Sequence, residues 1–210
     1  GLDGLWPNRF PDAGDGLEFN SVEASLWFVV AAHEYLSTKD AAGYKGNAVS
    51  ERAIRDAVQA IVEGYTKGTR HGIGMDLDGL LLSGEAGYAL TWMDAVIDGR
   101  AITPRRGKAV EVQCLWLNAL RIAAHRNAAL GETLSRAQCA FVERFWRADR
   151  GYLADVVDVG GEAGTADVRM RPNQLLAVGG LPYACVPRTL GKWILDAVER
   201  SLLMPMAVRT

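Results

Sequence analysis

Residues 109–126, AVEVQCLWLNALRIAAHR, are the stretch that decides the fold. Apolar side chains are dense along it, from Val110 through Trp116 to Ile122, and they follow helical rather than strand periodicity. A helix that is apolar on every side must be covered on every side. We therefore predict a buried helix from about Ala109 to Arg126.

A second helix of this kind is predicted from Asn20 to about Thr38, because residue 24 and residues 26–32 are all apolar. Asn20 and Glu23 have the spacing of a helix N-cap and its reciprocal partner three residues later. Further helices are predicted at about residues 54–65, 133–148 and 187–203. Their apolar residues form a single stripe, which is typical of a surface helix with one buried face.

Buried helices thus alternate with amphipathic ones, as an inner and an outer layer of helices would require. The helices of a four-helix bundle should all be amphipathic, so a toroid of paired helices fits better. Convincing strand alternation is absent from the sequence. The predicted fold class is therefore all-α.

Two long connections are the next feature of the chain. Residues 66–107 are rich in Gly, Asp, Trp and Tyr, and residues 149–174 include Asp155, Asp158, Asp167 and the run RPNQ. Long loops within a compact domain are uncommon and usually functional. We expect the active site to be built from them.

Bulk properties exclude several classes of partner. The formal net charge is -2, which gives no basic footprint for nucleic acid. No apolar run approaches the roughly 20 residues that span a bilayer, so no membrane partner is expected. The three cysteines are an odd number at wide spacing, which argues against a disulfide framework and a zinc site and suggests a cytoplasmic location.

Asp94 is the first candidate for chemistry, because it lies in the apolar run LTWMDAVI of residues 90–97. Partial desolvation would raise its pKa and keep it protonated as a general acid. The alternative is a loop aspartate that caps a turn or the start of a helix. Trp92, two residues earlier, is a candidate for stacking on a sugar ring.

Other carboxylates have equally open interpretations. Glu111 either stabilises a helix N-terminus or points inward to hold substrate hydroxyls. Glu23 either completes the helix cap or binds the sugar at the cleavage point. The segment 76–79, DLDG, lacks the further ligands of a calcium loop, so no metal and no cofactor are expected.

Several motifs together resemble one family. In chain order they are residues 5–11 (LWPNRFP), 22–28 (VEASLWF), 76–81 (DLDGLL), 90–95 (LTWMDA), 103–111 (TPRRGKAVE) and 171–174 (RPNQ). The chain resembles the C-terminal catalytic domain of bacterial and archaeal glycogen debranching enzymes, the amylo-α-1,6-glucosidases. Where this family has Asp-Ala-Ser-Leu-Trp, the present chain has Glu23 in the first position.

The resemblance implies an (α/α)6 barrel that hydrolyses α-1,6-glucosidic bonds at the branch points of glycogen or another branched α-glucan. It implies inversion by a general acid and a general base, with Asp94 as the acid. It also implies a substrate pocket lined by Glu23, Trp27, Trp92, Arg105, Lys108, Glu111, Asn173 and Gln174.

The resemblance further implies that residues 1–210 are part of one barrel domain and that the barrel is incomplete in this chain. Apolar helix surface exposed by an open barrel would favour a homo-oligomer. Two alternatives remain open from the sequence. One is a glucan-binding helical domain without catalysis, and the other is a different α-glucoside-processing enzyme on the same barrel.

Overall fold

The computed structural model describes residues 3–10, 12, 14, 16–43 and 46–210. Pro11, which belongs to one of the motifs quoted above, lies outside the described residues. The α-helices of the described part are α1 (Glu23–Ala41), α2 (Ala48–Lys67), α3 (Val110–Ala124), α4 (Leu130–Phe145) and α5 (Arg188–Leu202). The 3-10 helices are η1 (Arg70–Gly72), η2 (Val159–Gly161) and η3 (Pro172–Ala177).

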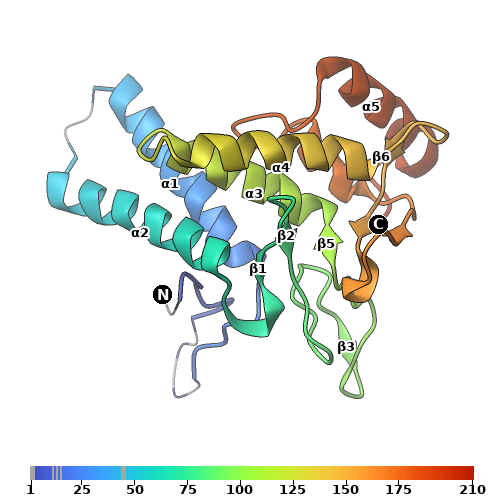
Figure 1. Cartoon of the computed structure of the whole chain (residues 1–210), viewed down its shortest axis with the longest axis horizontal. Helices are drawn as coiled ribbons and strands as arrows, with labels where there is room; N and C mark the ends of the chain where they lie inside the picture. The colour runs from blue at the N-terminus through green and yellow to red at the C-terminus, as the bar shows by residue number, and fades with distance from the viewer. Residues whose placement is uncertain (1–2, 11, 13, 15, 44–45) are drawn as a thin grey trace.

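Helix α3 is the centre of the fold. It contacts α1, α2, α4 and η3, and α2 and α5 lie on opposite sides of it (Figure 1). Every residue from Val110 to Leu120 is buried, and Trp116 Nε1 donates a hydrogen bond to the Gly79 carbonyl at 2.9 Å. The helix is apolar on every side because neighbours cover every side, as its sequence predicts.

Helix α1 departs from the prediction of full burial. Leu26, Val29 and Val30 face the core, but Trp27 and Ala31 are exposed. The predicted cap is also wrong, because the Ser21 hydroxyl, rather than Asn20, accepts the backbone N–H groups of Glu23 and Ala24 at 3.2 Å. The carboxyl group of Glu23 is therefore free for another role.

The surface helices behave as their single stripes predict. Helix α2 buries Val58, Ile61, Val62 and Tyr65, and helix α4 buries Ala137, Phe141 and Phe145. Tyr65 donates its hydroxyl to the Val22 carbonyl at 2.8 Å, which fixes α2 against the start of α1.

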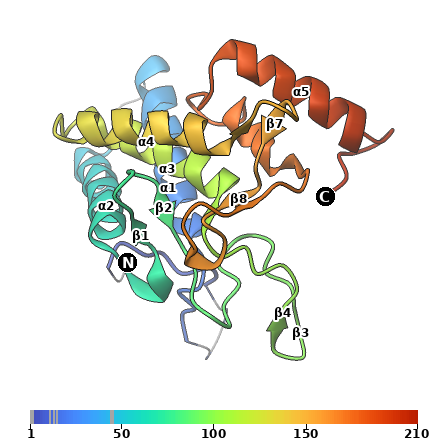
Figure 2. The ribbon, with the colours of Figure 1, turned by 45° about the vertical axis from the view of Figure 1, so that its right-hand side comes forward.

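The long connections contain short antiparallel strands. Strand β1 (Gly74–Met75) pairs with β2 (Leu81–Leu82), and β3 (Val96–Ile97) pairs with β4 (Arg100–Ala101). Strand β8 (Val156–Val157) lies between β5 (Lys108–Ala109) and β9 (Ala166–Asp167), and β6 (Trp146–Arg147) pairs with β7 (Tyr152–Leu153). In both views the β3–β4 hairpin projects from the side of the molecule away from α5 (Figure 2).

These strands overturn the predicted fold class. The expectation of an all-α protein, stated as an (α/α)6 barrel incomplete in this chain, is wrong because helices and several small antiparallel sheets occur together. Each strand has two residues, whereas the alternation that predicts a strand needs about four to eight. Within the described residues, no helix is both long enough and apolar enough to cross a membrane.

Candidate active site

A pocket of about 430 Å³ opens where α1, α3 and η3 meet the segment before β3. Its lining combines two carboxylates, two indole rings, an amide and apolar side chains: Glu23, Trp27, Trp92, Glu111, Leu115, Pro172, Asn173, Leu175 and Leu176. Five of the eight substrate-binding residues predicted from the sequence thus lie together, namely Glu23, Trp27, Trp92, Glu111 and Asn173.

Glu23 is the most perturbed ionisable group of the pocket. Only 5% of its surface is exposed, and its Oε2 accepts the backbone N–H of Trp92 at 2.9 Å. Its Oε1 is buried and has no hydrogen-bond partner among the described residues. Burial and the nearby charge of Glu111 raise the pKa of Glu23 from 4.5 to about 8, although the Trp92 N–H and Arg105 oppose the shift. At neutral pH this carboxyl group is therefore mainly protonated.

The two indole rings reach the pocket from different segments. Trp27 lies one helical turn after Glu23 on α1, and positions four residues apart share one face of a helix. Trp92 is held by its backbone bond to Glu23. The rings are 42% and 50% exposed, so their faces remain available to a ligand.

A buried guanidinium fixes Glu111. Arg105 Nη2 donates to Glu111 Oε2 at 2.6 Å, Nη1 donates to Oε1, and Nε donates to Asp155 Oδ2 at 2.8 Å. Burial opposes the charge of Arg105, but its bonds to Glu111 and Asp155 outweigh that penalty, so its pKa is raised. Asn173 Nδ2 also reaches Asp155 Oδ1, at 3.5 Å. Arg105 thus lies behind the pocket wall and orients Glu111.

Asp94 lies outside the pocket lining, two residues after Trp92, and is exposed. The desolvation expected for Asp94 is absent, and the buried carboxyl groups of the pocket lining are Glu23 and Glu111. Asp94 is nevertheless close enough to Glu23 for its negative charge to contribute to the raised pKa of that residue.

Comparison with known proteins decides the family. Residues 2–210 match the sequence model of a family described as amylo-alpha-1,6-glucosidase. The chain belongs to this family. Among solved structures, this amylo-alpha-1,6-glucosidase family member resembles a rhamnosidase from Klebsiella oxytoca with rhamnose bound, at 14% sequence identity and a TM-score of 0.62. The match covers 99% of this chain and 36% of the rhamnosidase chain. A search of curated proteins found no match.

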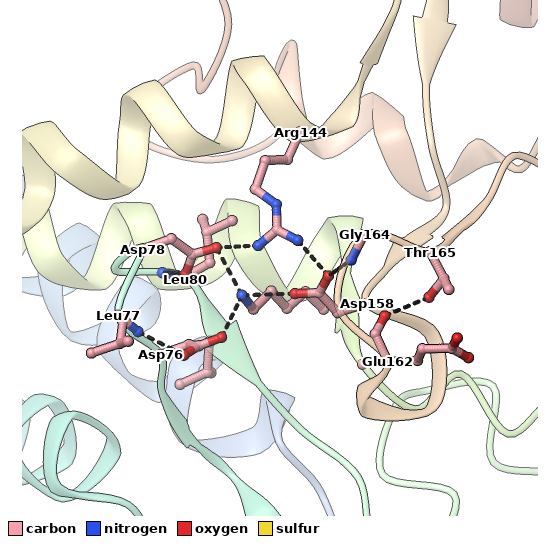
Figure 3. A network of polar contacts seen from close by, with 12 residues as sticks. Asp76, Leu77, Asp78, Leu80, Arg144, Asp158, Glu162, Gly164 and Thr165 are labelled. Atoms are coloured by element: carbon pink, nitrogen blue, oxygen red, sulfur yellow. Dashed lines mark hydrogen bonds and ion pairs between the residues drawn. The ribbon is translucent and has the colours of Figure 1, made fainter.

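Lys108 is predicted to bind substrate, but in this family member it lies outside the pocket lining. Its buried Nζ lies 2.8 Å from Asp76 Oδ2, 2.7 Å from Asp78 Oδ2 and 3.0 Å from Asp158 Oδ2. Arg144 bridges Asp78 and Asp158 from the other side (Figure 3). The three carboxylates are close enough to one another to hold a metal ion, but here they surround an ammonium group. This cluster joins the β1–β2 turn, α4 and η2.

Gln174 is also placed outside the pocket lining. Its Oε1 accepts the Leu153 N–H at 3.1 Å, and its Nε2 donates to the Arg171 carbonyl at 2.9 Å. Sequence reasoning in turn missed Asp155 as the partner of Arg105. A charged residue inside the apolar run of residues 153–157, LADVV, is the signal that could have found it.

Proposed function

We propose that the chain carries the sugar-binding pocket and the general acid of a glycoside hydrolase acting on α-1,6-glucosidic branch points of glycogen or a related branched α-glucan. The family match supports the class of reaction. The observation that carries the proposal is the pocket itself, whose lining combines Trp27 and Trp92 with Glu23, a carboxyl group whose buried Oε1 has no hydrogen-bond partner among the described residues.

The lining has the chemistry that a pyranose ring requires. Indole faces pack against the apolar face of a sugar, and Trp27 and Trp92 offer two such faces. A protonated Glu23 can donate a hydrogen bond to a sugar hydroxyl through Oε1 or Oε2 and accept another. Glu111, held by Arg105, and Asn173 add an acceptor and an amide to the same lining.

In the proposed reaction Asp94 gives its proton to the glycosidic oxygen as the C1–O6 bond breaks. Water attacks C1 from the opposite face, and a second carboxylate accepts the proton of that water, which inverts the configuration. Asp94 is exposed in this structure, and a glucan chain lying over Trp92 would cover the segment that carries it. Such cover would desolvate Asp94 and favour its protonated form.

The test is glucose release from a branched limit dextrin by the protein and by Asp94→Asn. We expect Asp94→Asn to lose at least about a hundredfold in rate, because general acid catalysis contributes about that much or more. The control is Asp98→Asn, since Asp98 is exposed in the β3–β4 hairpin and has a positive φ of 50°, which Asn tolerates.

The outcomes separate the alternatives. Full activity of Asp94→Asn would refute its role as the acid. Glucan binding by the protein without any turnover would favour a glucan-binding domain. Turnover of trehalose alone, or turnover only with phosphate present, would favour a different reaction on the same fold.

A further inference from the structure

A second pocket, of about 320 Å³, lies between α1, α2 and the end of α3. It shares no lining residue with the candidate active site. Helix α3 gives Glu111 to the active site and Ile122 to the second pocket, and eleven residues of helix span roughly 16 Å. The two pockets therefore lie toward opposite ends of α3, so a ligand in the second pocket would be separate from a substrate in the candidate active site.

The charge of the second pocket is predominantly positive. Arg55 and Arg126 both line it, and both also line an adjoining hollow, so their side chains border the same space. Neither guanidinium has a hydrogen-bond or ion-pair partner among residues 3–10, 12, 14, 16–43 and 46–210. The carboxylate of the pocket, Asp40, lies 3.3 Å from the Lys39 ammonium. Two unpaired cations thus face the space.

An aromatic and apolar wall completes the pocket. The Tyr183 hydroxyl lies 3.4 Å from His125 Nε2, and the centre of its ring is 5.7 Å from that of His33. The Arg121 guanidinium carbon lies 5.0 Å from the centre of the Tyr183 ring, which holds the ring in place. Leu36 and Val58 supply apolar surface.

We propose that this pocket binds a small phosphomonoester. Guanidinium groups match phosphate oxygens with paired donors, and two unpaired ones suit a dianion better than a monoanion. The Tyr183 hydroxyl and the two imidazoles provide further polar contacts, while the ring and the apolar wall receive the organic part of the ligand. A volume of about 320 Å³ is within the range of small-molecule pockets.

Isothermal titration calorimetry tests the proposal with three probes: inorganic phosphate, phenyl phosphate and glucose 6-phosphate. We expect saturable binding of one molecule per chain, with both monoesters tighter than phosphate because their organic parts contact the wall. A preference for phenyl phosphate or for glucose 6-phosphate distinguishes an aryl from a sugar ester. Free glucose should not bind here, so competition by glucose would contradict the proposal.

Matched variants locate the binding. Arg55→Gln and Arg126→Ala should each weaken monoester binding by about tenfold or more, since each removes a charge-assisted pair. The control Arg52→Gln removes the same charge from the same helix, but Arg52 lines only the adjoining hollow and pairs with Asp56 at 3.7 Å. It should change binding by less than about twofold.

Two results would overturn the proposal. One is the absence of saturable binding for all three probes. The other is equal weakening by Arg52→Gln and Arg55→Gln, which would mean general attraction to a basic surface. Arg126 is exposed, so its variant should fold even if Arg55→Gln does not, and thermal unfolding without ligand checks both. Because these measurements need no turnover, they do not depend on the proposed hydrolase activity.

Discussion

Replacing Glu23 by Gln should make the protein more stable, and increasingly so as the pH rises. Glu23 binds its proton in the folded protein up to a pKa of about 8, whereas in the unfolded chain it releases the proton near 4.5. Between these values the folded state holds a proton that the unfolded state has lost. Stability therefore falls as the pH rises through this window, and Gln, which cannot ionise, removes the loss.

The size of the effect follows from the pKa shift. Each pKa unit corresponds to about 1.4 kcal/mol. The raised pKa of Glu23 therefore lowers the free energy of unfolding of the wild type by about 3 kcal/mol at pH 7 and by less than about 1 kcal/mol at pH 5. The Gln side chain keeps an oxygen that can accept the Trp92 N–H, so this contact is retained. The stability gained by Glu23→Gln should therefore grow by about 2 kcal/mol between pH 5 and pH 7.

Urea unfolding followed by circular dichroism at pH 5, 6 and 7 measures this difference. The control is Glu34→Gln, which removes a carboxylate from an exposed position of the same helix. It should change stability by only a small amount, because the side chain is exposed. A stability gain from Glu23→Gln that stays constant across this range would refute the reasoning, because it would mean that Glu23 ionises alike in both states.

Two further predictions concern neighbouring groups. Lys108→Met should lower the free energy of unfolding by about 3 kcal/mol in urea, because it removes the cation beside Asp76 and leaves Asp78 and Asp158 with Arg144 alone. The exposed Lys67→Met should change it by less than about 0.5 kcal/mol. Equal losses would contradict a structural role for the Lys108 cluster. Trp27→Ala should weaken binding of a branched glucan by roughly five- to tenfold with little change in thermal unfolding, since the ring is exposed. The control is Trp193→Ala, since Trp193 is also exposed and lies on α5, outside the pocket lining. Unaltered glucan binding by Trp27→Ala would contradict a role of that ring in the site.

The sequence predicts burial correctly for a helix that is densely apolar along its whole length. The dense apolar run of α3 requires cover on all sides, and the structure supplies it. The same reasoning is wrong for α1, where Trp27 and Ala31 are exposed, because apolar composition does not distinguish a side that faces the core from a side that stays exposed. The two-residue strands are unpredictable for another reason. Their pairing, such as that of Lys108 with Val157, is fixed by contacts distant in sequence.

The candidate site, too, is predicted from the sequence only in part. Motif order and residue type bring Glu23, Trp27, Trp92, Glu111 and Asn173 to one pocket. Burial is what the sequence misjudges: the apolar run around Asp94 suggests desolvation, yet that residue is exposed on a connecting segment. Glu23 is desolvated because the backbone at residue 92, 69 positions later, lies over it. Neighbours along the chain cannot reveal such cover.

The protein buries ionisable groups in two contrasting ways, at Lys108 and at Glu23. Lys108 is surrounded by three carboxylates, so its burial is compensated and no donor remains for a ligand. Glu23 has one backbone partner, a negative neighbour and an oxygen that no described residue pairs with, so its burial costs stability. A cost of about 3 kcal/mol at pH 7 is a sizeable part of the 5–15 kcal/mol that keeps a domain folded. A ligand hydroxyl that pairs with Oε1 would recover part of this cost. Of the two predicted site residues, Glu23 is therefore the one whose burial is left uncompensated by the described part of the chain.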